Sequence, residues 1–115
     1  MSNERRSHVR VRPVPETPIK VELLGDIRIS VEVFDVSVGG LGLLREGPLA
    51  DAKIGSDLGF RVTVEGQEAI DVSCNVRHTG SARHPVVGVA FGQLEDDAAK
   101  RIRAYVSDLL ERGAG

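Results

Sequence analysis

Two consecutive runs of strict alternation between apolar and polar side chains constrain this chain more than any other feature. A Gly25-Asp26 pair, which is a short turn signal, separates them. A period of two is that of a β-strand with one buried face, so the pattern predicts two strands joined by a turn. The apolar positions are Ile19, Val21 and Leu23 in the first run, and Ile27, Ile29, Val31 and Val33 in the second.

Four further short strands are expected downstream, each bounded by glycine or proline. About six strands joined by turns predict an all-β sandwich or barrel, and 115 residues suit a single domain. Near the end of the chain the apolar period changes to three and four, which predicts an amphipathic helix at about residues 95–112, packed on the barrel. The expected later strands are Leu41 to Arg45, Leu58 to Val64, Ala69 to His78 and Val86 to Phe91.

The composition excludes several classes of protein. No stretch approaches the roughly 20 apolar residues that span a bilayer, and the first residues lack the apolar run of a secretory signal, so we expect a cytoplasmic protein without membrane insertion. Cys74 is the only cysteine, which rules out an intrachain disulfide or a thiolate cluster. We expect it to be a reduced, half-buried strand residue.

Residues 1–18 are predicted to form a flexible, arginine-rich N-terminal arm. Pro13, Pro15 and Pro18 block both a helix and a continuous central strand. The arm is basic: residues 1–12 carry a net charge of +3, whereas the whole chain carries −2 and the remainder therefore −5. An acidic body with few aromatic side chains argues against nucleic-acid binding and favours one small anion as the partner of the arm.

Arginines suit such a site because guanidinium is always charged, offers paired donors to phosphate or to a guanine edge, and stacks on bases. Three of them, Arg5, Arg6 and Arg10, fall within six residues and form a compact anion clamp. Taken alone, however, the same arginines read as a solvated basic tail.

A second candidate feature, Asp35-Val36-Ser37-Val38-Gly39-Gly40, directly follows the alternating strand. Period two places Asp35 and Ser37 on one side, roughly 6.5 to 7 Å apart, where a carboxylate and a hydroxyl can address one planar base edge. Gly39 and Gly40 permit positive φ and close approach of a ligand to the backbone. Taken alone, this segment also reads as an ordinary hairpin turn.

Catalysis and metal binding are weaker interpretations. A hydrolase triad would need Asp35, Ser37 and one of the histidines, yet no Gly-x-Ser-x-Gly elbow surrounds Ser37, so we expect no enzyme. Strand alternation places Cys74 and His78 on one face, but a third ligand would come from a loop and no fourth is present, so we expect no metal or cofactor. The histidines are His8, His78 and His84.

The pairing of the two features resembles the PilZ domain family. Arg6 and Arg10 match its Arg-x-x-x-Arg motif, and about 25 residues later Asp35, Ser37 and Gly40 match its Asp-x-Ser-x-x-Gly motif. Weaker family features follow in order along essentially the whole chain: Val76-Arg77, Gly88-Val89-Ala90-Phe91 and the C-terminal helix. The resemblance implies a six-stranded antiparallel β-barrel of the split-barrel type over residues 19–115, closed by that helix.

The resemblance further implies a receptor for the second messenger cyclic di-GMP that passes the signal to an unidentified downstream protein. By residue, Arg6 and Arg10 would contact phosphate and guanine, Asp35 and Ser37 would hydrogen-bond guanine, and Gly39 and Gly40 would allow close approach. Arg5, just before the first motif arginine, favours an intercalated pair of ligands, two per protomer.

The arm suggests how such a receptor would switch. We expect ligand binding to order the arm over the barrel face that carries Asp35 and Ser37. The alternative is a PilZ-like adaptor that acts through protein contacts without binding ligand.

Overall fold

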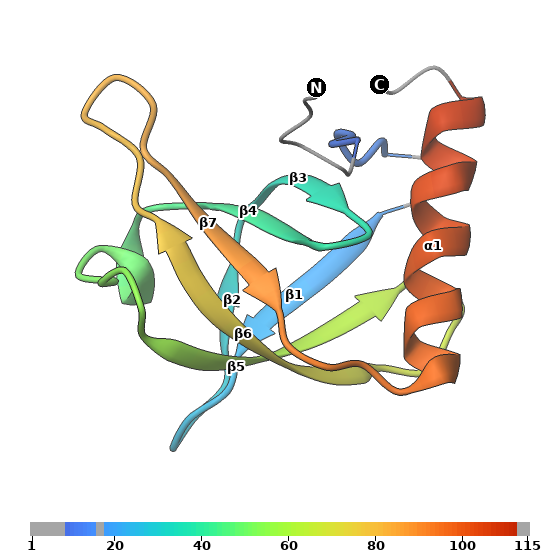
Figure 1. The fold of residues 1–115 in the computed structure, drawn as a ribbon, viewed down its shortest axis with the longest axis horizontal. Helices are drawn as coiled ribbons and strands as arrows, with labels where there is room; N and C mark the ends of the chain where they lie inside the picture. Colours follow the sequence, from blue (N-terminus) through green and yellow to red (C-terminus); the bar gives the residue numbers. More distant parts are fainter. Residues whose placement is uncertain (1–8, 16–17, 113–115) are drawn as a thin grey trace, which may run out of the picture.

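The structure, a computed structural model, describes residues 9–15 and 18–112 and is a nearly closed antiparallel barrel with one helix across its end (Figure 1). All strands belong to one sheet with the order β2-β1-β5-β6-β7-β4-β3. The predicted barrel and C-terminal helix are confirmed, although the sheet has seven strands where six were expected. The strands are Ile19–Leu23 (β1), Ile29–Val31 (β2), Val33–Ser37 (β3), Gly40–Leu44 (β4), Asp57–Val64 (β5), Ile70–His78 (β6) and Val86–Phe91 (β7), with a 3-10 turn at Gly47–Leu49 (η1) and the helix at Asp96–Glu111 (α1).

The extra strand arises at a corner of the chain. β2 and β3 lie at opposite edges of the sheet, and only Glu32 separates them in sequence. The prediction of one strand over residues 27–33 was therefore wrong: Ile27 is 70% exposed in the preceding loop, and Val33 already belongs to β3. At the corner, the Leu44 N–H donates to the Glu32 carbonyl at 2.9 Å. The barrel closes through this single residue because the chain leaves one sheet edge and immediately begins the other.

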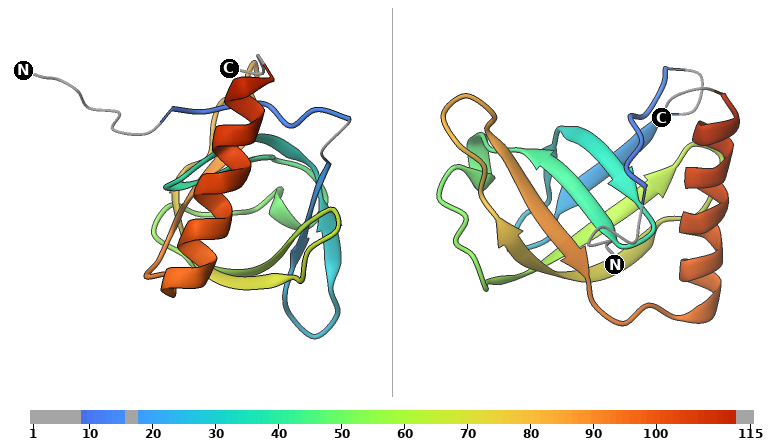
Figure 2. Two further views of the ribbon diagram at one scale, coloured as in Figure 1. Left: turned by 90° about the vertical axis from the view of Figure 1, so that its right-hand side faces the viewer. Right: turned by 45° about the horizontal axis from the view of Figure 1, so that its top comes forward.

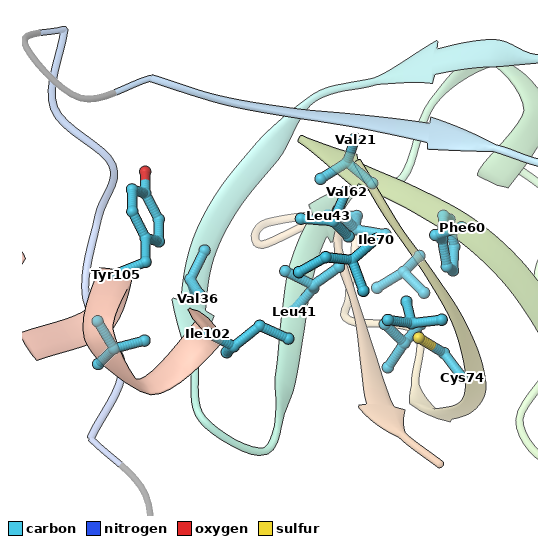
Figure 3. Close-up of a cluster of buried hydrophobic side chains, with 14 of the residues drawn as sticks. Val21, Val36, Leu41, Leu43, Phe60, Val62, Ile70, Cys74, Ile102 and Tyr105 are labelled. Carbon is cyan, nitrogen blue, oxygen red and sulfur yellow. The ribbon is translucent and has the colours of Figure 1, made fainter. Parts of the chain in front are cut away.

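One continuous aliphatic core fills the barrel and extends under the helix. Figure 3 shows Tyr105 and Ile102 of α1 beside Val36 of β3 and Leu41 of β4. The helix packs through four buried residues spaced at three and four, namely Ile102, Tyr105, Val106 and Leu109, as its amphipathic period predicts. Burying one such aliphatic side chain contributes about 1.5 to 3 kcal/mol, so the helix is an integral part of the domain.

In the described part of the N-terminal arm, Val11 is buried and paired with the barrel. Val11 is 1% exposed, and its N–H and C=O each pair with Val36 of β3 at 2.8 Å. Figure 2 shows this segment, in blue, passing the C-terminal half of α1 on its way to β1. Residues 1–8 of the arm lie outside the described residues, so the predicted flexibility of the arm as a whole remains a prediction.

Across residues 9–15 and 18–112, no helix combines the length and the apolar character that crossing a membrane requires.

Candidate functional site

The two sequence features meet at an ion pair on the outside of the barrel. Arg10 NH1 donates to Asp35 Oδ1 at 2.7 Å, and the two side chains are 29% and 15% exposed. The position of Val11 brings Arg10 and Asp35 together. Its side chain is buried and its backbone pairs with Val36, so the neighbouring Arg10 side chain extends to the outer face, where Asp35 lies.

Gly42, which the sequence analysis did not single out, supports the Asp35 carboxylate. Gly42 of β4 is the cross-strand partner of Asp35, and a Cβ at this position would overlap the carboxylate. The carboxylate therefore lies across the backbone of β4, in space that a side chain would otherwise fill. A glycine within a predicted strand is the signal that could have identified this position.

Ser37 lies on the same side of β3 as Asp35, as period two predicts, because the strand register is regular from Asp35 to Ser37. Its side chain differs from Asp35 in accessibility: Ser37 is 3% exposed, and its Oγ accepts hydrogen bonds from the N–H groups of Gly39 at 3.2 Å and Gly40 at 3.1 Å. The hydroxyl thus holds the two-residue loop between β3 and β4 in shape.

Gly39 lies in this loop and Gly40 begins β4. Neither uses the positive φ that glycine permits, a region occupied in the described residues by glycines elsewhere in the chain. A Cβ on Gly40 would overlap the carbonyl oxygen of Val89 in β7, and the Gly39 carbonyl accepts from the Phe91 N–H at 2.8 Å. The missing side chain of Gly40 therefore lets the hairpin lie close against β7, and the Gly39 carbonyl bonds to the same strand.

Two of the candidate arginines, Arg5 and Arg6, lie outside the described residues, as does His8. Of the predicted ligand-binding set, the structure brings together Arg10, Asp35, Ser37, Gly39 and Gly40. Arg10 and Asp35 lie on the outer face, while Ser37 and Gly40 are buried in the hairpin directly behind Asp35.

The residues considered for catalysis or metal binding do not form a cluster. The prediction that Cys74 and His78 share a face was wrong, because the register of β6 against β7 shifts between Val76 and His78, leaving Cys74 buried and His78 exposed. Cys74 is 2% exposed, not half-buried, and burial raises the pKa of its thiol to about 12. Within the described segments, no three His, Cys, Asp or Glu side chains are placed to hold a metal ion.

The sequence model of the PilZ domain family matches residues 4–108, which is nearly the whole chain. A curated relative, the flagellar brake protein YcgR of Methylibium petroleiphilum, is 25% identical over 118 residues. That match covers 95% of this chain and 52% of the relative, so the chain spans about half the length of the protein that it matches.

Solved structures with the same fold include two complexes with cyclic di-GMP. MrkH of K. pneumonia in its c-di-GMP complex has a TM-score of 0.76 at 17% identity, covering 96% of this chain and 55% of that one. YcgR of Escherichia coli in complex with c-di-GMP has a TM-score of 0.73 at 20% identity, covering 96% and 48%. At these identities the likeness establishes the shared fold.

Proposed function

This chain belongs to the PilZ domain family, and from that premise we propose that it is a receptor for cyclic di-GMP. The observation that carries the proposal is the Arg10–Asp35 pair, which unites the two family motifs on the outer face of the barrel. That two relatives of the same fold are complexes with this ligand supports the choice of ligand.

Arg10 and Asp35 present complementary chemistry to such a ligand. A carboxylate accepts hydrogen bonds from the N–H groups on a guanine edge, while a guanidinium donates to phosphate or stacks on the base. Arg10 holds Asp35 through one oxygen, so in this structure each group also orients the other. We assign phosphate and guanine contacts to Arg10 and Arg6, and a guanine edge to Asp35.

Ser37, Gly39 and Gly40 shape the hairpin beside that carboxylate. Because Ser37 Oγ accepts two backbone N–H bonds and donates to the Gly40 carbonyl at 3.5 Å, it would reach guanine only by giving up part of this support. These residues would therefore serve the ligand site mainly by fixing the position of the hairpin. The direct contact that the family motif implies would come in addition.

Residues 1–8 would close over the ligand, with the docked Val11 as a fixed point. Arg5, placed before Arg6, supports a stoichiometry of two stacked ligands per protomer. The ordered arm would then present a changed surface to a downstream protein in the cytoplasm. The proposed activity is recognition and signalling, without a catalytic step or a cofactor.

Isothermal titration calorimetry with cyclic di-GMP tests the proposal. Wild type should bind, and Arg10→Ala should bind about 10- to 100-fold more weakly, since a charge-assisted contact is worth roughly 1.5 to 3 kcal/mol. Arg61→Ala removes an arginine from β5, which is a neighbour of neither β3 nor β4 in the sheet, and should leave affinity unchanged.

The outcomes separate the alternatives. Absence of binding by folded wild type would refute the receptor and leave the adaptor that acts through protein contacts alone. Normal affinity in Arg10→Ala would refute the assigned site. A stoichiometry of one would refute the paired ligand.

A further inference from the structure

Arg12 lies beside the proposed ligand site but belongs to neither family motif. It follows Arg10 by two residues, and the buried Val11 between them directs both arginines to the outer face. Arg12 is exposed, and its Cζ lies over the ring of Phe34 at 4.1 Å from the ring centroid. Phe34 immediately precedes Asp35 in β3.

Phe34 is itself held in place from a third segment. The ring of His84, in the loop between β6 and β7, meets the Phe34 ring edge-on, with centroids 5.2 Å apart and an interplanar angle of 87°. Phe34 also sits where the register of β3 against β4 shifts, between Val33 and Asp35. This irregularity lets Phe34 and Asp35 both contribute to the surface that the arm covers.

The stack has the properties of a base-binding platform. A guanidinium against an aromatic ring is held flat by cation–π attraction, and its other face remains available for a second planar group. Arginine stacked in this way binds purines through their π face, independently of hydrogen bonds to the base edge. The Phe34–Arg12 pair offers such a face beside a carboxylate and guanidinium that address the edge and the phosphate.

We propose that Arg12, supported by Phe34, is a further ligand-binding residue whose exposed face stacks on a purine of the bound dinucleotide. This inference rests on the proposed function and adds to it a residue that binds a base of the ligand through its plane. It separates two tasks on the arm: Arg10 binds through directed hydrogen bonds and Arg12 binds through its plane.

Substitutions at Arg12 distinguish stacking from simple attraction. In calorimetric titrations with cyclic di-GMP, Arg12→Ala should bind about 10-fold more weakly, the usual effect of losing one stacked base. Arg12→Lys should be nearly as weak, because an ammonium keeps the charge but lacks the plane. Phe34→Leu should also weaken binding, and Arg28→Ala, which removes an exposed arginine from the β1–β2 loop, should not.

A spectroscopic measurement separates stacking from a role in docking the arm. The ring current of a stacked purine should move the Arg12 Nε–H resonance upfield when cyclic di-GMP is added. Wild-type affinity in Arg12→Lys, or an Nε–H resonance that does not move at saturation, would refute the platform while leaving the receptor proposal intact. Failure of the wild type to bind would instead remove the proposed function and this inference with it.

Discussion

Two arginine–aspartate pairs on the surface of the barrel share one closest distance and differ in their bonding and their surroundings. The shortest N···O distance is 2.7 Å both in Arg10–Asp35 and in Arg61–Asp71. Arg61 and Asp71 are direct cross-strand partners on β5 and β6, and a second bond of 3.0 Å completes a two-pronged contact. Asp35 has Gly42 opposite it and receives its arginine from the arm.

The difference shows how a pair that belongs to the scaffold can be told from one that is available to a ligand. In Arg61–Asp71 both carboxylate oxygens are used within one hairpin. In Arg10–Asp35 a single oxygen is used, and within the described part of the chain the second has no hydrogen-bond partner. An arginine–carboxylate pair with unused donors and acceptors can accept a ligand that a saturated pair would exclude.

The largest expected difference in ligand affinity is between variants that lose one or the other carboxylate. Asp35→Ala should weaken cyclic di-GMP binding about 10- to 100-fold, because a guanine edge loses its charged acceptor, whereas Asp71→Ala should leave affinity unchanged. Calorimetry on both variants, with circular dichroism to verify folding, measures the contrast.

Exchanging the partners sharpens this test. The Arg61→Asp/Asp71→Arg double variant should retain wild-type affinity, while Arg10→Asp/Asp35→Arg should not regain it even if the reversed pair forms. Recovery of ligand binding in the second double variant would mean that the pair acts only as a structural clasp.

A moderate effect is expected from filling the space that the Asp35 carboxylate occupies. Gly42→Ala would force Asp35 off β4 and should weaken ligand binding roughly 5-fold, corresponding to about 1 kcal/mol. Gly59→Ala on β5 is the matched control, because a Cβ there meets only Leu24 and a backbone oxygen at ordinary contact distance. Equal affinity in the two variants would show that the position of Asp35 does not depend on Gly42.

The smallest effect concerns acid stability. The hydrogen bond from Arg61 lowers the pKa of Asp71 below its ordinary value of 3.8. The folded state therefore binds this proton less readily than the unfolded chain, so the pair stabilises the protein above that value, and the contribution is lost as pH falls through the lowered pKa.

Because Asp71 is exposed and Arg61 is partly exposed, this contribution is small and screened by salt. Urea unfolding at about pH 5 and about pH 2.5 should show a slightly steeper loss of stability in wild type than in Asp71→Asn, and the difference should shrink at high salt. An identical pH dependence in the two proteins would contradict the assignment.

Regular strands were predictable because alternation reports directly on a sheet with one buried face. The Val86 to Phe91 strand has the expected bounds, and the expected Ala69 to His78 strand begins one residue later, at Ile70. The corner at Glu32 was not predictable, because apolar alternation continues from Ile29 to Val33 across it. Apolar periodicity shows which face of a strand is buried, but it does not show where the chain passes from one edge of the sheet to the other.

The sequence patterns named candidate residues for the site but not the contacts between them. Burial of Val11 was missed, although Val9-Arg10-Val11-Arg12 is itself an alternating run; its prolines and charges favoured reading the segment as a solvated arm. Cross-strand neighbours such as Gly42 depend on register, which a single sequence does not specify. The close fit of Gly40 depends on the approach of β7, a contact between residues far apart in the chain.

The pairing of Val11 with the barrel also limits how far Arg6 can lie from the proposed ligand site. Arg6 precedes Arg10 by four positions, so the length of the chain alone keeps their Cα atoms within about 14 Å of each other. Confinement to a sphere of that radius corresponds to an effective concentration on the order of 0.1 M. If the proposed site is correct, a ligand held by Arg10 and Asp35 would therefore meet Arg6 at this high local concentration, and the arm would not have to find it by diffusion.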